Sequence, residues 1–365
     1  MKVAIVHYWL LNMRGGEKVL QALLELFPGA DIYTHVYDPA SMPENIRACK
    51  IYTSYIQKLP FAKKMYQKYM PLMPNALGGF NLQDYDLVIS SESGPAKGVV
   101  PNPDAYHICY CHSPMRYLWD MYHEYFRKSA FLTRFFMKRF IPSLRLWDVC
   151  SANLVDLFVA NSDYVAKRIR RYYNREAAVV YPPADIEKFI SVERRPKDFY
   201  LFFGQLAGYK RADLAIQACI ASGRKLVVAG AGAKPAEKRN HEKSGLVTFT
   251  GRVSDEELRE LYASARALLF PGIEDFGIIP VEANAAGCPV IAFGKGGVLN
   301  TVKEGETGLL FYEQTPASLI RAIEEFESRE GQFRDRAPFT AHVQQFSHEA
   351  FREKILRIVA ERKRA

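Results

Sequence analysis

The sequence contains no run of about 20 apolar residues, the length that a helix needs to cross a bilayer. The N-terminal segment MKVAIVHYWL also differs from a signal peptide, because His7 interrupts its apolar run and its pattern is that of a strand. We therefore expect a cytoplasmic protein that has neither a membrane-spanning helix nor a signal peptide.

Cysteine is too sparse and too scattered for a disulfide framework, and this distribution favours a reducing compartment. An Asp-x-Asp metal signature at a strand end is also lacking, since Asp84–Asp86 has this spacing but precedes a predicted strand. A metal site at Cys109-x-Cys111-His112 is the less favoured alternative, because no second cluster of ligands follows it. We therefore expect no metal ion and no cofactor. The six cysteines are Cys49, Cys109, Cys111, Cys150, Cys219 and Cys288.

Acidic residues are outnumbered by basic ones, 40 against 49, which gives a formal net charge of +9. This balance favours anionic partners such as nucleotide phosphates, lipid diphosphates, lipid headgroups or nucleic acid, but it does not choose among them. The 365 residues, 48% of them hydrophobic, are too many for one compact core. Two domains are therefore expected.

Short apolar runs alternate with segments of helical periodicity in two series, which predicts an α/β fold with doubly wound parallel sheets. The first series starts at Lys2–His7, and the second starts at Phe199–Phe203 after the pattern halts near Tyr181–Asp185. We predict domains at residues 1–186 and 187–347, and a C-terminal helix at 348–365 that packs toward the N-terminal domain. The other expected strands are Ala30–Thr34, Leu87–Ser90, His107–Cys111, Leu157–Asn161, Lys225–Val228, Val247–Phe249, Ala267–Phe270, Val290–Ala292 and Gly308–Phe311.

The most specific motif is the segment Pro271–Ala283, in which Glu274 and Glu282 bracket seven residues. A helix predicted to start near Ile278 presents free backbone N–H groups, which suit a diphosphate. Glu274 is then placed to accept hydrogen bonds from sugar hydroxyls, and Glu282 from a nucleotide ribose. The alternative is that Glu274 and Asp275 only cap the helix.

This motif resembles the Glu-x7-Glu motif of retaining glycosyltransferases of family four, which have the GT-B fold of two Rossmann-like domains facing across a cleft. The resemblance extends over nearly the entire chain and includes Gly204–Leu206, Lys210–Arg211, Phe249–Val253, Ala286–Ala292, Gly296–Gly297 and Gly305–Gly308. Other segments resemble the mannosyltransferases that build bacterial O-antigen and exopolysaccharide repeats, namely Gly15–Lys18, Lys58–Pro60, Leu72–Pro74 and Cys111–Arg116.

The resemblance implies catalytic roles for Glu274, Lys210 and His112. Lys210 matches the lysine that binds the donor diphosphate, and His112 matches the histidine that contacts the donor sugar near its C6 hydroxyl. A solvated lysine and a core or capping histidine are the alternatives.

The implied donor-binding residues surround these groups and depart from the family at one position. The family arginine five residues before Lys210 is Gln205 here, so either Arg211 or Arg252 supplies a second cation or Lys210 acts alone. Gly15 and Gly16 let backbone amides approach a phosphate, although a plain tight turn is the alternative. The remaining donor-binding residues are Phe276, Gly277, Ile278, Ile279 and Glu282.

Two segments interleave basic and aromatic residues, Lys50–Tyr69 and Met115–Trp147. Such a composition suits the surface of an anionic membrane, where rings lie at headgroup depth and cations bind phosphates. The alternative is a set of helices that pack their aromatic residues on the core and leave the cations in solvent. We expect a protein that associates peripherally with the inner face of the cell membrane.

Together these features predict a retaining, metal-independent glycosyltransferase. The resemblance favours an α-mannosyltransferase that uses GDP-mannose and a polyprenyl-diphosphate-linked or oligosaccharide acceptor in lipopolysaccharide or exopolysaccharide biosynthesis. A nucleotide-sugar epimerase or phosphorylase of the same fold is the alternative enzyme. A nucleic-acid-binding protein is disfavoured, because no recognition motif accompanies the basic segments.

Overall fold

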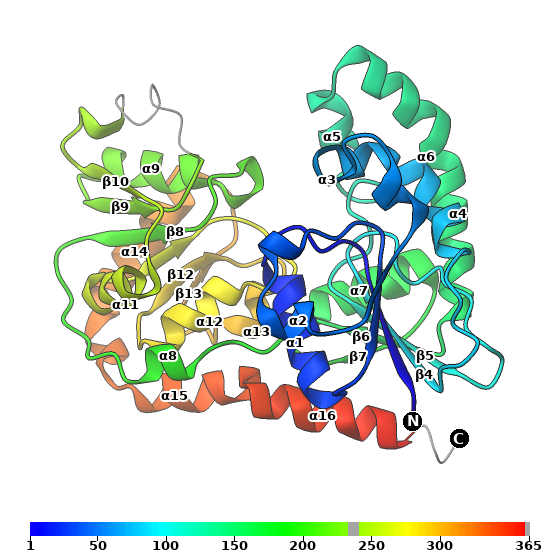
Figure 1. Ribbon diagram of the computed structural model, residues 1–365. Coiled ribbons are helices and arrows are strands. Elements are labelled where there is room, and N and C mark those ends of the chain that lie inside the picture. Colours follow the sequence, from blue (N-terminus) through cyan, green and yellow to red (C-terminus); the bar gives the residue numbers. More distant parts are fainter. Residues whose placement is uncertain (233–240, 362–365) are drawn as a thin grey trace. The chain divides into compact units, whose positions relative to one another are not determined.

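The structure is a computed structural model that describes residues 1–232 and 241–361 (Figure 1). Its internal contacts divide the chain into two compact units. The first contains Met1–Pro182 and Arg352–Ala365, and the second contains Pro183–Phe351. The division therefore lies between two adjacent prolines, four residues before the predicted start of the second domain.

The first unit contains a seven-stranded parallel sheet in the order β3-β2-β1-β4-β5-β6-β7. Its strands are β1 (Val3–His7), β2 (Asp31–Thr34), β3 (Ile51–Thr53), β4 (Leu87–Glu92), β5 (Tyr106–Cys111), β6 (Leu157–Ala160) and β7 (Ala177–Val179). Its helices are α1 (Gly15–Leu26), α2 (Glu44–Arg47), α3 (Ala62–Met65), α4 (Met73–Leu77), α5 (Tyr122–Lys128), α6 (Phe131–Ser151) and α7 (Asp163–Tyr173).

The second unit contains a six-stranded parallel sheet in the order β10-β9-β8-β11-β12-β13. Its strands are β8 (Tyr200–Phe203), β9 (Leu226–Ala229), β10 (Val247–Gly251), β11 (Leu268–Phe270), β12 (Val290–Phe293) and β13 (Gly308–Phe311). Its helices are α8 (Glu187–Ile190), α9 (Ala212–Ala221), α11 (Asp255–Ser264), α12 (Ile278–Ala285), α13 (Val298–Thr301), α14 (Pro316–Arg329) and α15 (Ala337–Val343). The last helix, α16 (His348–Glu361), begins in this unit and continues into the residues grouped with the first.

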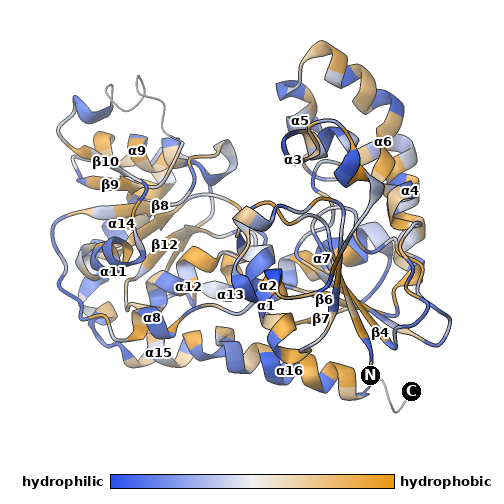
Figure 2. Cartoon of the chain, viewed as in Figure 1, coloured by the Kyte–Doolittle hydropathy of each residue, from blue (hydrophilic) through white to orange (hydrophobic). Residues whose placement is uncertain are grey.

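Burial explains why these segments read as apolar runs rather than as alternating patterns. Every residue of β1, β4 and β12 is buried, as expected where helices cover both faces of a parallel sheet. In the second unit, apolar residues of α9 and α14 pack with the strands in one core, which includes Leu214, Leu319 and Ile323. Figure 2 shows the corresponding hydrophobic colouring along the strands.

The predicted fold class is confirmed, because each unit is a parallel α/β sheet of the Rossmann type. The strands predicted from the sequence all occur, with ends that differ by at most two residues. Two further strands, β3 and β7, were not predicted. They form the two edges of the first sheet and are short and half-exposed, so they lack the apolar run of a central strand.

The C-terminal helix α16 buries an apolar stripe. Phe351, Ile355 and Val359 are buried, and they recur at helical intervals. In the parts of the chain that the structure describes, no helix combines the length and the apolarity that crossing a bilayer requires.

Candidate active site

In the second unit, the motif residues lie on loops that follow adjacent strands. Gly204–Arg211 follows β8, Pro271–Gly277 follows β11, and Gly294–Gly297 follows β12. Strands β8 and β11 are neighbours. The chain continues from β8 to β9 and β10 on one side of this pair, and from β11 to β12 and β13 on the other. This is the topological switch point, where open α/β sheets bind ligands beyond the carboxyl ends of their strands.

The two proposed catalytic residues of this unit meet directly. The Nζ atom of Lys210 lies 2.9 Å from the Oε1 atom of Glu274, and both side chains are largely but not fully covered. Lys210 ends a short 3-10 turn, Gly208–Lys210, while Glu274 lies in the loop before α12. The structure thus places one cation and one carboxylate together at the switch point, and Glu274 pairs with Lys210 rather than capping α12.

Glycines allow the loops around this ion pair to pack closely. A side chain at Gly272 would place Cβ 2.7 Å from the Cα of Lys210, and one at Gly297 would place Cβ 2.4 Å from the Cα of Phe276. The N–H of Gly297 donates to the carbonyl of Glu274 at 2.9 Å. Gly230, whose φ is +129°, packs against the carbonyl of Gly204 in the same way. The positions of Lys210 and Glu274 therefore depend on backbone contacts that any larger residue would disrupt.

Helix α12 begins beside Glu274 with no side-chain cap. Its N-cap is Gly277 in a left-handed conformation with φ of +91°. The first N–H groups of a helix have no intrahelical partner, so the amides at Ile278 and Ile279 suit an anion. The side chains of Phe276 and Ile279 are buried, and Phe276 packs edge-on against Phe346. These positions can therefore offer a ligand only their backbone.

Glu282 lies on α12, one turn beyond its start, and is half-buried. It interacts with Tyr262, whose buried hydroxyl has a pKa raised well above its usual value by burial first and by Glu282 second. This hydroxyl therefore stays protonated next to the carboxylate of Glu282.

The three residues considered for the missing family arginine differ in their availability. Gln205 is exposed. The Nε atom of Arg211 lies 3.1 Å from both carboxylate oxygens of Asp213, so this guanidinium already has a partner. Arg252 follows β10 and is exposed, and within residues 1–232 and 241–361 no carboxylate forms an ion pair with it. Of the two arginines, Arg252 is the one whose charge is left for a ligand.

In the first unit, His112 directly follows β5, as predicted, and its backbone is fixed on both sides. Its N–H donates to the carbonyl of Glu92 at 2.8 Å, and its carbonyl accepts from Asn161 Nδ2 at 2.9 Å. The Nε2 atom of the ring lies 2.9 Å from Ser91 Oγ. Burial, with a smaller effect of His7, lowers the pKa of His112 to about 3, so the ring is neutral at physiological pH.

Gly15 and Gly16 are the first two residues of α1 rather than part of the preceding turn. A Cβ at Gly16 would lie 2.4 Å from the hydroxyl of Tyr8, whereas a Cβ at Gly15 would have nothing within 4 Å. Packing inside the first unit thus explains why position 16 has no side chain. Gly15 borders open space, as a glycine reserved for a ligand would.

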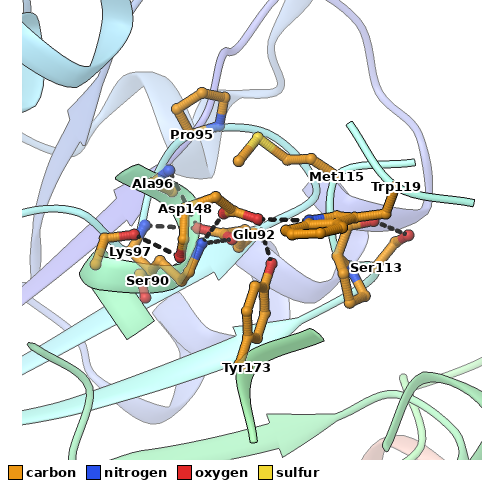
Figure 3. A network of polar contacts seen from close by, with 12 residues as sticks. Ser90, Glu92, Pro95, Ala96, Lys97, Ser113, Met115, Trp119, Asp148 and Tyr173 are labelled. Atoms are coloured by element: carbon orange, nitrogen blue, oxygen red, sulfur yellow. Dashed lines mark hydrogen bonds and ion pairs between the residues drawn. The ribbon is translucent and has the colours of Figure 1, made fainter. Parts of the chain in front are cut away.

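Glu92, the last residue of β4, is part of a buried ionic network (Figure 3). Lys97 Nζ pairs with Glu92 Oε1 at 2.8 Å and with Asp148, and none of the three side chains is exposed. Trp119 and Tyr173 donate to the second oxygen of Asp148. Glu92 also accepts from the backbone of Ala96 and Lys97, so the network fixes the loop that follows β4. It explains Glu92 structurally, without a ligand.

The two basic-aromatic segments separate into packed and exposed parts. Tyr66 and Tyr69 pack against a buried cluster, and Lys63 pairs with Asp38 at 2.8 Å. In the other segment, Met115 and Leu118 are buried. The N-terminal half of α6 is different, because Phe131, Leu132, Phe135 and Phe136 are exposed there beside Lys138 and Arg139.

Sequence reasoning missed three residues that contact one another next to His112: His7, Glu17 and Ser91. His7 and Ser91 each occupy the carboxyl half of a central strand, and polar residues there were the available signal.

Within the described ranges, no group of three or more His, Cys, Asp or Glu residues is arranged so that it could hold a metal ion.

Two family models match the chain, one in each half. Residues 184–340 match "Glycosyl transferases group 1", and residues 13–188 match "Glycosyltransferase Family 4". A D-inositol 3-phosphate glycosyltransferase of Streptomyces avermitilis is 28% identical over 204 residues, covering 47% of this chain and 44% of that protein. An uncharacterised glycosyltransferase of Methanocaldococcus jannaschii is 32% identical over 137 residues, or 34% of each chain. This chain thus spans less than half the length of either curated relative.

Solved structures resemble the whole chain. Anabaena HepE in complex with UDP has a TM-score of 0.72 at 16% identity and covers 99% of this chain and 100% of its own. Sucrose-phosphate synthase of Thermosynechococcus elongatus has a TM-score of 0.71 at 18% identity, with 99% of each chain covered. At such identities the likeness shows a shared fold.

Proposed function

This chain is a glycosyltransferase-family protein of the GT-B fold, with a family 4 domain at residues 13–188 and a group 1 domain at residues 184–340, and we propose that it transfers a sugar from a nucleoside-diphosphate donor with retention. The observation that carries this proposal is the Lys210–Glu274 pair at 2.9 Å beside the start of α12. It combines a cation for a diphosphate with an acceptor for sugar hydroxyls at the switch point.

In the proposed reaction, the diphosphate lies at Lys210 and at the amides that begin α12. Positive charge and fixed N–H dipoles there stabilise the negative charge that grows on the leaving group. Glu274 accepts hydrogen bonds from the sugar hydroxyls, and Glu282 accepts from the ribose. His112 contacts the donor sugar through a neutral ring.

The transfer exchanges one bond for another on the same face of the sugar. The bond between the anomeric carbon and the diphosphate oxygen breaks, and a bond from the acceptor oxygen to that carbon forms. The proton of the acceptor hydroxyl passes to the leaving diphosphate, so the products are a nucleoside diphosphate and a glycosylated acceptor. No carboxylate nucleophile is invoked, since Glu274 is the one carboxylate proposed to contact the sugar and retention through a covalent intermediate needs a close pair.

For the donor we propose GDP-mannose, which follows from the mannosyltransferase-like segments Gly15–Lys18 and Cys111–Arg116. The structures of HepE are in complex with UDP and with UDP-glucose, which makes a UDP-sugar the competing donor. A thermal-shift panel separates the two, because a ligand at 100 times its Kd stabilises the folded state by about 2.7 kcal/mol. We expect GDP and GDP-mannose to raise the midpoint more than their uridine counterparts.

For the acceptor we propose a polyprenyl-diphosphate-linked saccharide of cell-surface glycan synthesis at the inner face of the membrane. The exposed aromatic residues of α6, next to Lys138 and Arg139, support this proposal. Cations near an anionic leaflet each contribute about 1 kcal/mol, so several give reversible attachment.

The deciding experiment replaces Glu274 by Ala. Loss of a charged hydrogen bond at the reacting sugar should raise the activation free energy by about 2–4 kcal/mol, which lowers kcat/KM roughly 30-fold or more. Glu313→Ala is the matched control, because Glu313 is an exposed carboxylate that also pairs with a cation, Arg321 at 3.7 Å. More than a third of the activity remaining in a folded Glu274→Ala protein contradicts the assignment. Free sugar released in place of a glycosylated acceptor indicates a phosphorylase or an epimerase instead.

A further inference from the structure

A chain of polar side chains crosses the switch point of the first sheet, which lies between β1 and β4. His7 ends β1 and pairs in register with Ser91 of β4. The Oγ atom of Ser91 lies 3.0 Å from His7 Nδ1 and 2.9 Å from His112 Nε2. His7 and Ser91 are fully buried, so water does not compete for these contacts.

Glu17 of α1 closes the far end of this chain. Its Oε1 atom lies 3.7 Å from His7 Nε2, and its side chain is only 3% exposed. Its other oxygen, Oε2, accepts from the backbone N–H of Arg14 at 3.0 Å. In the described part of the chain, His7 Nε2 makes no hydrogen bond within the usual limit, so the carboxylate is the group that it faces.

With His7 and His112 both neutral and the single proton of Ser91 donated to one of them, two arrangements satisfy both contacts. In the first, Ser91 donates to His112 and accepts from His7 Nδ1–H, which leaves the lone pair of His7 Nε2 facing a carboxylate. In the second, His7 carries its proton on Nε2 and directs it at Glu17. Ser91 then donates to His7 Nδ1 and accepts from His112 Nε2–H. The carboxylate favours the second arrangement, because a lone pair facing an anion is repulsive.

We propose that Glu17, His7 and Ser91 are positioning residues that hold His112 in its Nε2–H tautomer, so that Nδ1 accepts a hydrogen bond from a sugar hydroxyl. The use of Nδ1 rests on the proposed function, whereas the tautomer does not. Within the described residues no hydrogen bond occupies Nδ1 of His112, and the side chain is only partly covered. The low pKa of about 3 keeps this nitrogen free of a second proton.

The direct test is nitrogen-15 NMR of the histidine rings in the ligand-free protein, with His112 identified by the loss of its signals in His112→Gln. We expect Nε2 of His112 to carry the proton. A proton on Nδ1 overturns the proposal. This measurement needs neither activity nor a mutation in the positioning residues.

Glu17→Gln provides a sharper second test, because it should reverse the whole chain. If the amide oxygen keeps the bond to Arg14, the amide NH2 faces His7 Nε2 and donates to it. His7 Nδ1–H then donates to Ser91, which donates to His112 Nε2, and the proton of His112 moves to Nδ1. An unchanged tautomer of His112 in Glu17→Gln overturns the proposed coupling.

Ser90→Ala is the matched control for Ser91→Ala, since Ser90 makes the same kind of contact with a different histidine, His107 Nε2 at 2.9 Å. We expect Ser91→Ala to give a mixture of His112 tautomers and a roughly tenfold loss of kcat/KM that Ser91→Thr restores. Ser90→Ala should alter only the signals of His107. If the tautomers behave as expected but no nucleotide sugar binds, the proposed function fails and the positioning chain stands. If transfer is found but Ser91→Ala leaves the His112 tautomer unchanged, the positioning chain fails and the proposed function stands.

Discussion

At the scale of the residue, the candidate site depends on pairs whose members the sequence separates widely. Lys210 and Glu274 are 64 positions apart, yet their charged atoms are 2.9 Å apart. In the absence of a ligand each neutralises the other. A diphosphate and a sugar hydroxyl would replace this contact with two new ones, so both residues are held ready without an uncompensated charge.

Replacing Lys210 by Ala should lower kcat more than it weakens donor binding. Charge on the leaving diphosphate grows toward the transition state, so the ammonium acts most strongly there. We expect a loss of kcat of about 100-fold, or roughly 2.7 kcal/mol, as for other removed charge-stabilising donors. Lys210→Arg, which keeps the charge, should retain part of the activity. Steady-state kinetics decide, and a raised KM with unchanged kcat contradicts the role.

Arg252→Ala and Arg211→Ala test which cation replaces the family arginine at Gln205. Because Arg211 is held by Asp213 and Arg252 has no such partner in the described chain, Arg252→Ala should weaken nucleoside-diphosphate binding more. We expect a loss of roughly tenfold for Arg252→Ala and less than twofold for Arg211→Ala, since a hydrogen bond to a charged group contributes about 1.5 kcal/mol. Isothermal titration with GDP and UDP measures both, and equal losses would assign the role to neither arginine alone.

At the scale of the element, glycine contacts set where helix α12 and its preceding loop lie. Gly297 packs on Phe276, while Gly272 packs on Lys210, so two loops from separate strands reach the ion pair with no side chain between them. The start of α12 is thereby fixed relative to Glu274.

Gly297→Ala should therefore damage the site through packing alone. The φ of Gly297 is −67°, which alanine adopts readily, but its Cβ would lie 2.4 Å from the carbonyl oxygen of Asp275. Overpacking of this kind costs about 1–3 kcal/mol, so we expect a lower thermal midpoint and weaker donor binding. The control is Gly331→Ala, whose Cβ would meet nothing within 4 Å. Equal behaviour of the two variants in thermal shift and donor titration would show that the loop adapts.

The exposed half of α6 should attach the protein to anionic vesicles. We expect sedimentation with such vesicles at low salt and release at high salt, because exposed charges are screened over about 8–10 Å at physiological ionic strength. Replacing Lys63, Lys64, Lys138 and Arg139 together by Ser should abolish sedimentation and spare transfer to a short water-soluble acceptor.

Two double variants locate the attachment on one helix. Lys138→Ser with Arg139→Ser should account for most of the loss, since both residues are exposed beside Phe135 and Phe136. Lys63→Ser with Lys64→Ser is the matched control, because Lys63 is already paired with Asp38. If the quadruple variant sediments like the wild type, α6 does not carry membrane binding.

At the scale of the whole molecule, two parallel sheets each present loops and polar side chains at a switch point. In the proposed reaction, the second unit offers Lys210, Glu274 and the start of α12 to the nucleotide sugar. The first offers His112, together with the open space at Gly15. The proposed chemistry needs only these protein groups.

We therefore expect transfer to proceed in the presence of EDTA at the rate measured without it. The leaving diphosphate is stabilised by Lys210 and backbone dipoles in this proposal, so chelation removes nothing that the reaction uses. Initial rates with and without EDTA, followed by addition of Mg²⁺ or Mn²⁺, provide the measurement. Strong inhibition that either ion reverses would show that a metal takes part.

The sequence alone was sufficient for the two series of strands, for the motif Pro271–Ala283 and for the position of His112 after β5. These features depend on local pattern, because buried parallel strands read as apolar runs and ligand groups follow their carboxyl ends. Edge strands β3 and β7 escaped detection because they are short and half-exposed.

Only the tertiary structure decided which side chains meet. It paired Lys210 with Glu274, tied Arg211 to Asp213 and left Arg252 without an ion-pair partner in the described chain. It also buried Glu92 against Lys97 and joined Glu17 to His112 through His7 and Ser91. Such contacts join residues from different strands and loops, and their distances depend on strand order and packing rather than on any local pattern. The sequence therefore determined the fold and the class of chemistry, while the folded chain decided how each candidate residue is held.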